Sequence, residues 1–119
     1  MTNVVARDIE RAADAVRSAN HATMRGALDG PETYAVVGNL AELIHRLPQL
    51  LDYLARGLRR AAPAQHYDDR GAEPAGALCH AQGHLTDARA LVDALGDHLD
   101  HAHNHLGHLG RLTLRRSEP

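Results

Sequence analysis

The sequence has no lysine, phenylalanine or tryptophan, and it has only three tyrosines and one cysteine among its 119 residues. Strands are usually rich in aromatic and β-branched residues, so this shortage argues against a β-sandwich or a β-barrel. The apolar residues are mostly alanine, leucine and valine, which suit the close packing of helices. We therefore expect an all-α protein whose residues 1–119 form a single domain with its own core.

Other absences bear on location and source. Cys79 has no second cysteine to pair with, and Arg7 and Asp8 bring charges too early for a secretory signal. No apolar run approaches the roughly 20 residues that span a membrane. All thirteen basic residues are arginine, which is typical of a GC-rich bacterial coding sequence. We expect a cytoplasmic protein with no membrane partner.

The charge pattern gives little support to nucleic-acid binding. The formal net charge is −2, so the chain has no basic footprint of the usual kind. The arginines gather in two clusters, Arg56, Arg59 and Arg60, and Arg111, Arg115 and Arg116. Aromatic residues are not interleaved with them, and arginine near a helix C-terminus complements the helix dipole. We interpret the clusters as solvated helix ends, with a nucleic-acid-associated regulator as the alternative.

The spacing of apolar residues predicts a first helix over about residues 3–25. Its apolar positions are spaced four, three, four and three residues apart, which places them on one stripe: Val5, Ile9, Ala12, Val16 and Ala19. An amphipathic helix of this kind requires a partner surface. Gly26 and Gly30 end the pattern, and Asp29 or Gly30 is the expected cap of a second helix with Pro31 in its first turn.

The second predicted helix covers about residues 31–62 and is the most apolar segment. Its heptad seam consists of Val37, Leu40, Ile44, Leu47, Leu51, Leu54 and Leu58. Pro48 lies inside this pattern, where proline removes a backbone donor and crowds the preceding turn. A kink or a break is expected there, and the seam that continues in phase favours the kink. Residues 63–73 are polar and are predicted to form a surface connection.

The third predicted helix covers about residues 74–112 and has the strongest periodicity. Counting Leu78 as position a, the a row is Leu78, Leu85, Val92, Leu99 and Leu106, and the d row is Ala81, Ala88, Leu95, Ala102 and Leu109. Alternating leucine and alanine suits close antiparallel packing. Several glycines lower the helix propensity by roughly 1 kcal/mol each, so packing must supply most of the stability.

These segments predict an antiparallel three-helix bundle with long, coiled-coil-like second and third helices. Two helices this apolar would leave a seam exposed, which favours a homodimer formed through helical faces. The residues expected at the interface are Leu78, Leu85, Val92, Leu99, Leu106, Leu51, Leu54 and Leu58.

Histidine is the chemically conspicuous residue, with ten in the chain. Six of them fall at the adjacent c and g positions of the third helix: His80, His84, His98, His101, His105 and His108. Pairs spaced i, i+4 let two imidazoles reach one metal ion, but a zinc site needs about four ligands, so the others would come from another helix or chain. Solvated boundary histidines are the favoured interpretation. A proton switch is a further hypothesis, because protonation of all ten would move the formal charge from −2 to +8.

Catalysis finds little support in the sequence. The two serines, Ser18 and Ser117, belong to no nucleophile motif, and the glycines are scattered singly instead of forming a phosphate-binding loop. We predict no enzymatic activity, no cofactor and no small-molecule substrate. The expected function is a protein–protein interaction or assembly module that binds itself and another protein, with a His-dependent metal-binding bundle as the alternative.

The stretch "GPETYAVVGNLAELIHRLPQLLDYLARGL", followed by an Asp-rich connection and an Ala/Leu/His helix ending in "HLGHLG", resembles small helical proteins of actinomycetes with no assigned activity. The likeness covers about two thirds of the chain, through the second and third segments, and rests on composition and spacing. It implies an all-helical fold and no particular chemistry.

Overall fold

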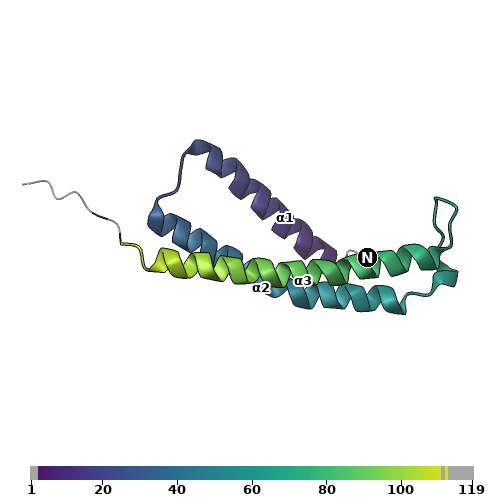
Figure 1. The fold of residues 1–119 in the computed structure, drawn as a ribbon. Coiled ribbons are helices and arrows are strands. Elements are labelled where there is room, and N and C mark those ends of the chain that lie inside the picture. The colour runs from purple at the N-terminus through teal and green to yellow at the C-terminus, as the bar shows by residue number, and fades with distance from the viewer. Residues whose placement is uncertain (1–2, 111, 113–119) are drawn as a thin grey trace, which may run out of the picture.

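The computed structural model describes residues 3–110 and 112, and these residues form three α-helices joined by short connections (Figure 1). Helix α1 covers Val4–Ala22, α2 covers Gly30–Arg60 and α3 covers Pro74–Gly107. Two short 3-10 turns follow α1 and α2, at Thr23–Arg25 and Pro63–Gln65. The described part of the chain contains no strand, so the all-α prediction is confirmed.

The start of each helix follows from local sequence. The Asn3 side chain accepts hydrogen bonds from the first turn of α1. Asp29 caps α2 in a capping box with Glu32, which satisfies backbone donors at both positions. Pro31 and Pro74 occupy the first turns of α2 and α3, where a missing N–H costs nothing. The cap predicted at residue 29 or 30 is therefore Asp29.

Two predicted helix ends lie too far along the chain. The second helix ends at Arg60 instead of residue 62, because Pro63 forces Ala62 into an extended conformation. The third ends at Gly107 instead of residue 112, and His108 is its C-cap. The glycines near this end supply little helix propensity. Pro48 lies inside a single continuous α2, so the break considered for that position is absent.

Helices α2 and α3 pack along their length as an antiparallel pair (Figure 1), as predicted for the two long helices. The buried apolar residues lie on α2: Ala41, Ile44 and Ala55. On α3 the whole a row from Leu78 to Leu106 is half-buried against α2. The core of the molecule is therefore a narrow seam between two helices.

The second row of this seam differs from the sequence-based prediction. Most of the d row is exposed, including Ala81, Leu95 and Ala102, whereas the e row faces α2. After the exposed Ala75, the e row of α3 consists of Gln82, Arg89, Gly96 and His103. Helix α3 is thus rotated about its axis relative to the prediction. This rotation lets glycine and polar side chains of α3 meet matching residues of α2.

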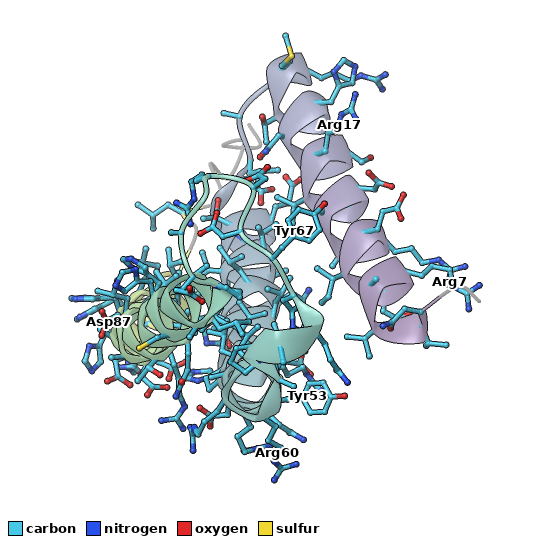
Figure 2. All side chains as sticks on the ribbon, turned by 90° about the vertical axis from the view of Figure 1, so that its right-hand side faces the viewer. Arg7, Arg17, Tyr53, Arg60, Tyr67 and Asp87 are labelled. Atoms are coloured by element: carbon cyan, nitrogen blue, oxygen red, sulfur yellow. The ribbon has the colours of Figure 1, made fainter. Side chains whose placement is uncertain are left out.

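Helix α1 lies apart from this pair (Figures 1 and 2). No residue of α1 is buried, and neither α2 nor α3 comes within packing distance of it. Its charged side chains, such as Arg7, project away from the pair (Figure 2). The third helix of the fold thus keeps its apolar stripe in contact with solvent.

Candidate functional site

The first candidate surface is the apolar stripe of α1, which we call the α1 stripe: Val5, Ile9, Ala12, Val16 and Ala19. All five residues are exposed, and Ile9 and Val16 each keep 45% of their surface accessible. Soluble helices normally bury such a stripe against a neighbouring element. The structure therefore confirms that these residues share one face, and among the residues it describes no other helix packs against that face.

A second apolar surface lies on α2, beside its seam with α3. We call it the α2 flank: Val36, Leu40, Leu43, Leu47, Leu50 and Leu54. Four of its residues are exposed, with Val36 at 50% accessible, and Leu47 and Leu50 are half-buried. All six side chains are aliphatic, so the flank is an uncharged strip about 27 Å long.

The predicted interface residues are placed mostly inside the chain. The five a-row residues of α3 from Leu78 to Leu106 are half-buried at the α2–α3 seam, and so are Leu51 and Leu58. Leu54 is more exposed and belongs to the α2 flank. The sequence pattern that suggested an interface between copies thus describes contacts within one copy, and other residues are free to meet a partner.

A surface hollow continues the α2 flank at the end of α2. It has a volume of about 730 Å³ and is lined by Tyr53, Leu54, Arg56, Gly57, Leu58, Arg60 and Leu85. The lining contains no carboxylate, thiol or imidazole group. Leucine and tyrosine side chains and two arginines line the hollow. This lining suits an apolar contact better than acid–base chemistry.

Three ring side chains pack over glycines across the α2–α3 seam. His103 of α3 lies against Gly38, and its Nε2 atom is 2.7 Å from where a Cβ at that glycine would sit. His45 of α2 lies against Gly96 in the same way, at 2.8 Å for its Cε1 atom. Tyr34 approaches Gly107 at 3.3 Å. Each glycine provides the notch that a ring from the opposite helix occupies.

Polar contacts accompany these notches. The His45 Nε2 atom lies 2.8 and 2.9 Å from the two carboxylate oxygens of Asp100, and the Arg89 Nε atom lies 2.9 Å from Oδ1 of Asp52. The Tyr34 and His103 rings stack with centroids 4.1 Å apart. These contacts join α2 to α3 at a single antiparallel register.

The sequence contained a signal for this register that periodicity of apolar residues alone did not reveal. Gly38 and His45 are seven residues apart on α2, and Gly96 and His103 are seven apart on α3. In an antiparallel pair this spacing lets each histidine meet the glycine of the other helix. Helix propensity treats these glycines only as weak helix formers, and the spacing of apolar residues does not place His45 or His103 in the seam.

The predicted metal-ligand candidates all lie on the exposed side of α3. His80, His84, His98, His101, His105 and His108 are exposed. Within the described residues of one chain, no three His, Cys, Asp or Glu side chains come together in a group that could hold a metal. On α2, Glu42 lies three residues before His45 and is paired with Arg46.

The remaining polar candidates occupy the ends of the pair. Arg56, Arg59 and Arg60 are exposed at the C-terminal end of α2, where arginine complements the helix dipole. Their counterparts, Arg111, Arg115 and Arg116, lie outside the described residues.

Cys79 is an exposed free thiol. None of the described helices has both the length and the apolar character that crossing a membrane requires.

The connection between α2 and α3 contains one ordered polar turn. The Asp68 carboxylate accepts hydrogen bonds from the backbone N–H of Arg70 and from its guanidinium, at 2.9 to 3.0 Å. The Arg70 side chain is the main cause that holds the pKa of Asp68 below its ordinary value. Gly71, with φ of 85°, completes the turn in a conformation that favours glycine.

Comparisons with protein-family models, with curated proteins and with solved structures each gave no match to this chain. No ligand or catalytic residue can therefore be assigned to these surfaces from a relative. Three features of the chain itself bear on its function: two exposed apolar strips on α1 and α2, a closely matched seam between α2 and α3, and a row of imidazoles on the outside of α3.

Proposed function

We propose that the chain is a non-enzymatic helical assembly module that binds a second copy of itself. The observation that carries the proposal is the α1 stripe, an amphipathic face of which no residue is buried in the described part of the chain. Val5, Ile9 and Val16 keep 40 to 45% of their surfaces accessible. Covering that remaining surface is worth about 1 kcal/mol for each side chain, so a partner face is favoured strongly by the stripe as a whole.

The α2 flank supplies a complementary surface of similar shape. The stripe spans about 21 Å of helix and the flank about 27 Å. Both are aliphatic, so neither would bury an unpaired charge against the other. If α1 of each copy covers the α2 flank of its partner, the two contacts are identical and related by a two-fold axis, which closes the assembly as a dimer.

The test is the mass of the untagged protein in solution, measured by sedimentation in the presence of a metal chelator. The wild type is expected to be a dimer. The double variant Ile9→Glu, Val16→Glu places two carboxylates on the α1 stripe and is expected to be a monomer with unchanged helical content by circular dichroism.

The matched control is the double variant Arg7→Gln, Arg11→Gln, which shifts the net charge by the same amount on the other side of α1. It should remain a dimer. A wild type that is monomeric at every accessible concentration would contradict the proposal. Dissociation of the control to the same extent as the stripe variant would show that charge, and not the apolar face, controls the mass.

A further inference from the structure

The outward side of α3 carries a second heptad seam that is distinct from the one facing α2. Ten positions alternate at spacings of three and four residues: Ala77, His80, His84, Asp87, Leu91, Ala94, His98, His101, His105 and His108. This row, which we call the outer row, lies about 160° around the helix from the α2 seam. Every member except the half-buried Ala77 is exposed, and Leu91 is 71% exposed. Figure 2 shows Asp87 on the side of α3 away from α2.

The spacing of the outer row is symmetric about a centre between Leu91 and Ala94, and histidines occupy the second and third layers on both sides of the central pair. In an antiparallel pair of α3 helices that meet along this row, a c position of one helix faces a g position of the other. The register that places Leu91 opposite the partner's Ala94 also places Asp87 opposite the partner's His98. The apolar centre is then flanked by carboxylate–imidazole pairs of complementary character.

The same register sets histidine against histidine in two successive layers. His84 faces the partner's His101, and His80 faces the partner's His105. A shift of one heptad in one direction would place Asp87 opposite the partner's Leu91, and a shift in the other would place Leu91 opposite the partner's His101. Both shifts set a polar group against the central leucine, so the symmetric register is preferred.

We infer that the outer row pairs with that of a second copy around two zinc ions. Each ion would be bound by His80 and His84 of one chain together with the partner's His101 and the partner's His105. Histidines spaced i, i+4 on a helix reach one ion, and four imidazoles at about 2.0–2.1 Å complete the tetrahedral coordination that structural zinc prefers. One chain supplies only two ligands to a site, which agrees with the absence of a metal-binding group within the described residues of a single copy.

This inference rests on the proposed self-assembly and extends it by naming a second face and the ion that closes it. Leu91 and Ala94 are the only apolar residues near the centre of the outer row, so the row has little driving force of its own. Four metal–nitrogen bonds at each site supply the missing free energy. Pairing of α3 helices should therefore depend on zinc, whereas pairing through the α1 stripe should not.

The experiment separates the two faces by using the Ile9→Glu, Val16→Glu variant as the background. The untagged protein is stripped with a chelator, dialysed and titrated with zinc chloride. The expected result is a monomer without zinc, a dimer with zinc, and one zinc per chain by elemental analysis of the dimer fraction. Cobalt chloride in place of zinc should give the visible absorption of tetrahedral Co²⁺.

Variants of the outer row sharpen the test. His84→Ala with His101→Ala removes two of the four ligands from each site and should abolish both the zinc and the dimer. His66→Ala with His108→Ala removes the same number of imidazoles from outside the sites and should change neither. Leu91→Glu places two carboxylates at the centre of the pair and should lower the dimer fraction at least tenfold.

A zinc-loaded chain that stays monomeric would overturn the inference, and so would equal loss of zinc in the His84/His101 and His66/His108 variants. Neither result would affect the wild type's mass in chelator, which tests the α1 stripe alone. If the wild type itself is monomeric in chelator, the zinc titration is carried out on it directly, and the same outcomes decide the second face.

Discussion

Helices α1 and α3 are both amphipathic, yet of these two only α3 packs against another helix among the described residues. The apolar stripe of α1 is uninterrupted from Val5 to Ala19, but none of the helix is buried. The seam of α3 mixes leucines with Arg89, Gly96 and His103, and it makes a long contact with α2. An apolar stripe therefore indicates the need for a partner, whereas matched notches, rings and ion pairs select which partner and at what register.

The largest expected effect compares a buried isoleucine with an exposed one. Ile44 is 8% exposed at the α2–α3 seam, and Ile9 is 45% exposed on α1. Ile44→Ala should lower the free energy of unfolding by about 2 to 4 kcal/mol. Ile9→Ala should lower it by about 0.5 kcal/mol or less when measured below the concentration of self-association. Urea unfolding followed by circular dichroism measures both, and equal losses would mean that α1 packs within the chain.

The next comparison uses glycines of the two long helices. Gly83 has open space around it, so Gly83→Ala should stabilise the protein by about 1 kcal/mol through helix propensity. At Gly38 a Cβ would lie 2.7 Å from Nε2 of His103 and would displace the ring from Tyr34. Gly38→Ala should therefore destabilise by about 1 kcal/mol despite its better propensity. Thermal unfolding of the two variants shows whether the notch sets the register.

A smaller effect is expected at the ion pair between α2 and α3. Arg89 and Asp52 are each more than 40% exposed, so solvent screens their attraction. Asp52→Asn should cost about 0.5 kcal/mol at low ionic strength and less at high ionic strength. Glu42→Gln, which removes a pair within one turn of α2, is the control. A larger loss in the control would show that the contact between helices adds nothing.

The smallest effect is expected in the connection before α3. The pKa of Asp68 lies below its ordinary value because the Arg70 side chain donates to its carboxylate. A lowered folded-state pKa stabilises the turn above the ordinary aspartate range, and this contribution is lost as the pH falls through the folded-state value. Arg70→Ala should raise the pKa of Asp68 toward its ordinary value, which NMR titration measures. The helical content should not change at neutral pH.

The helices were predictable because their signals are local. Asp29 and Glu32 form a capping box within one turn, and Pro74 opens α3 at a position where proline is favoured. The a row from Leu78 to Leu106 required only a count of seven residues. The ends were predicted less well, because the glycine-rich end of α3 at Gly107 offers a gradual loss of propensity instead of a stop.

The seam of α3 was predicted only in part. The d row looked suitable because it is apolar, but the e row faces α2 because Gly96 admits His45 and Arg89 reaches Asp52. The spacing of apolar residues does not detect a glycine notch, nor does it detect a charged partner on the other helix. The histidines of the outer row share one strip, but their exposure places that strip opposite the α2 seam and not at its boundary.

Local signals in the sequence specify the three helices, where they begin and which residues share a face, because hydrogen bonding, capping and periodicity act over a few residues. Which faces meet is set by contacts between residues far apart in the chain. That choice depends on the fit of rings such as His45 and His103 into glycines some fifty residues or more away, and on the free energy of a whole seam. It left the α1 stripe and the outer row of α3 exposed to solvent.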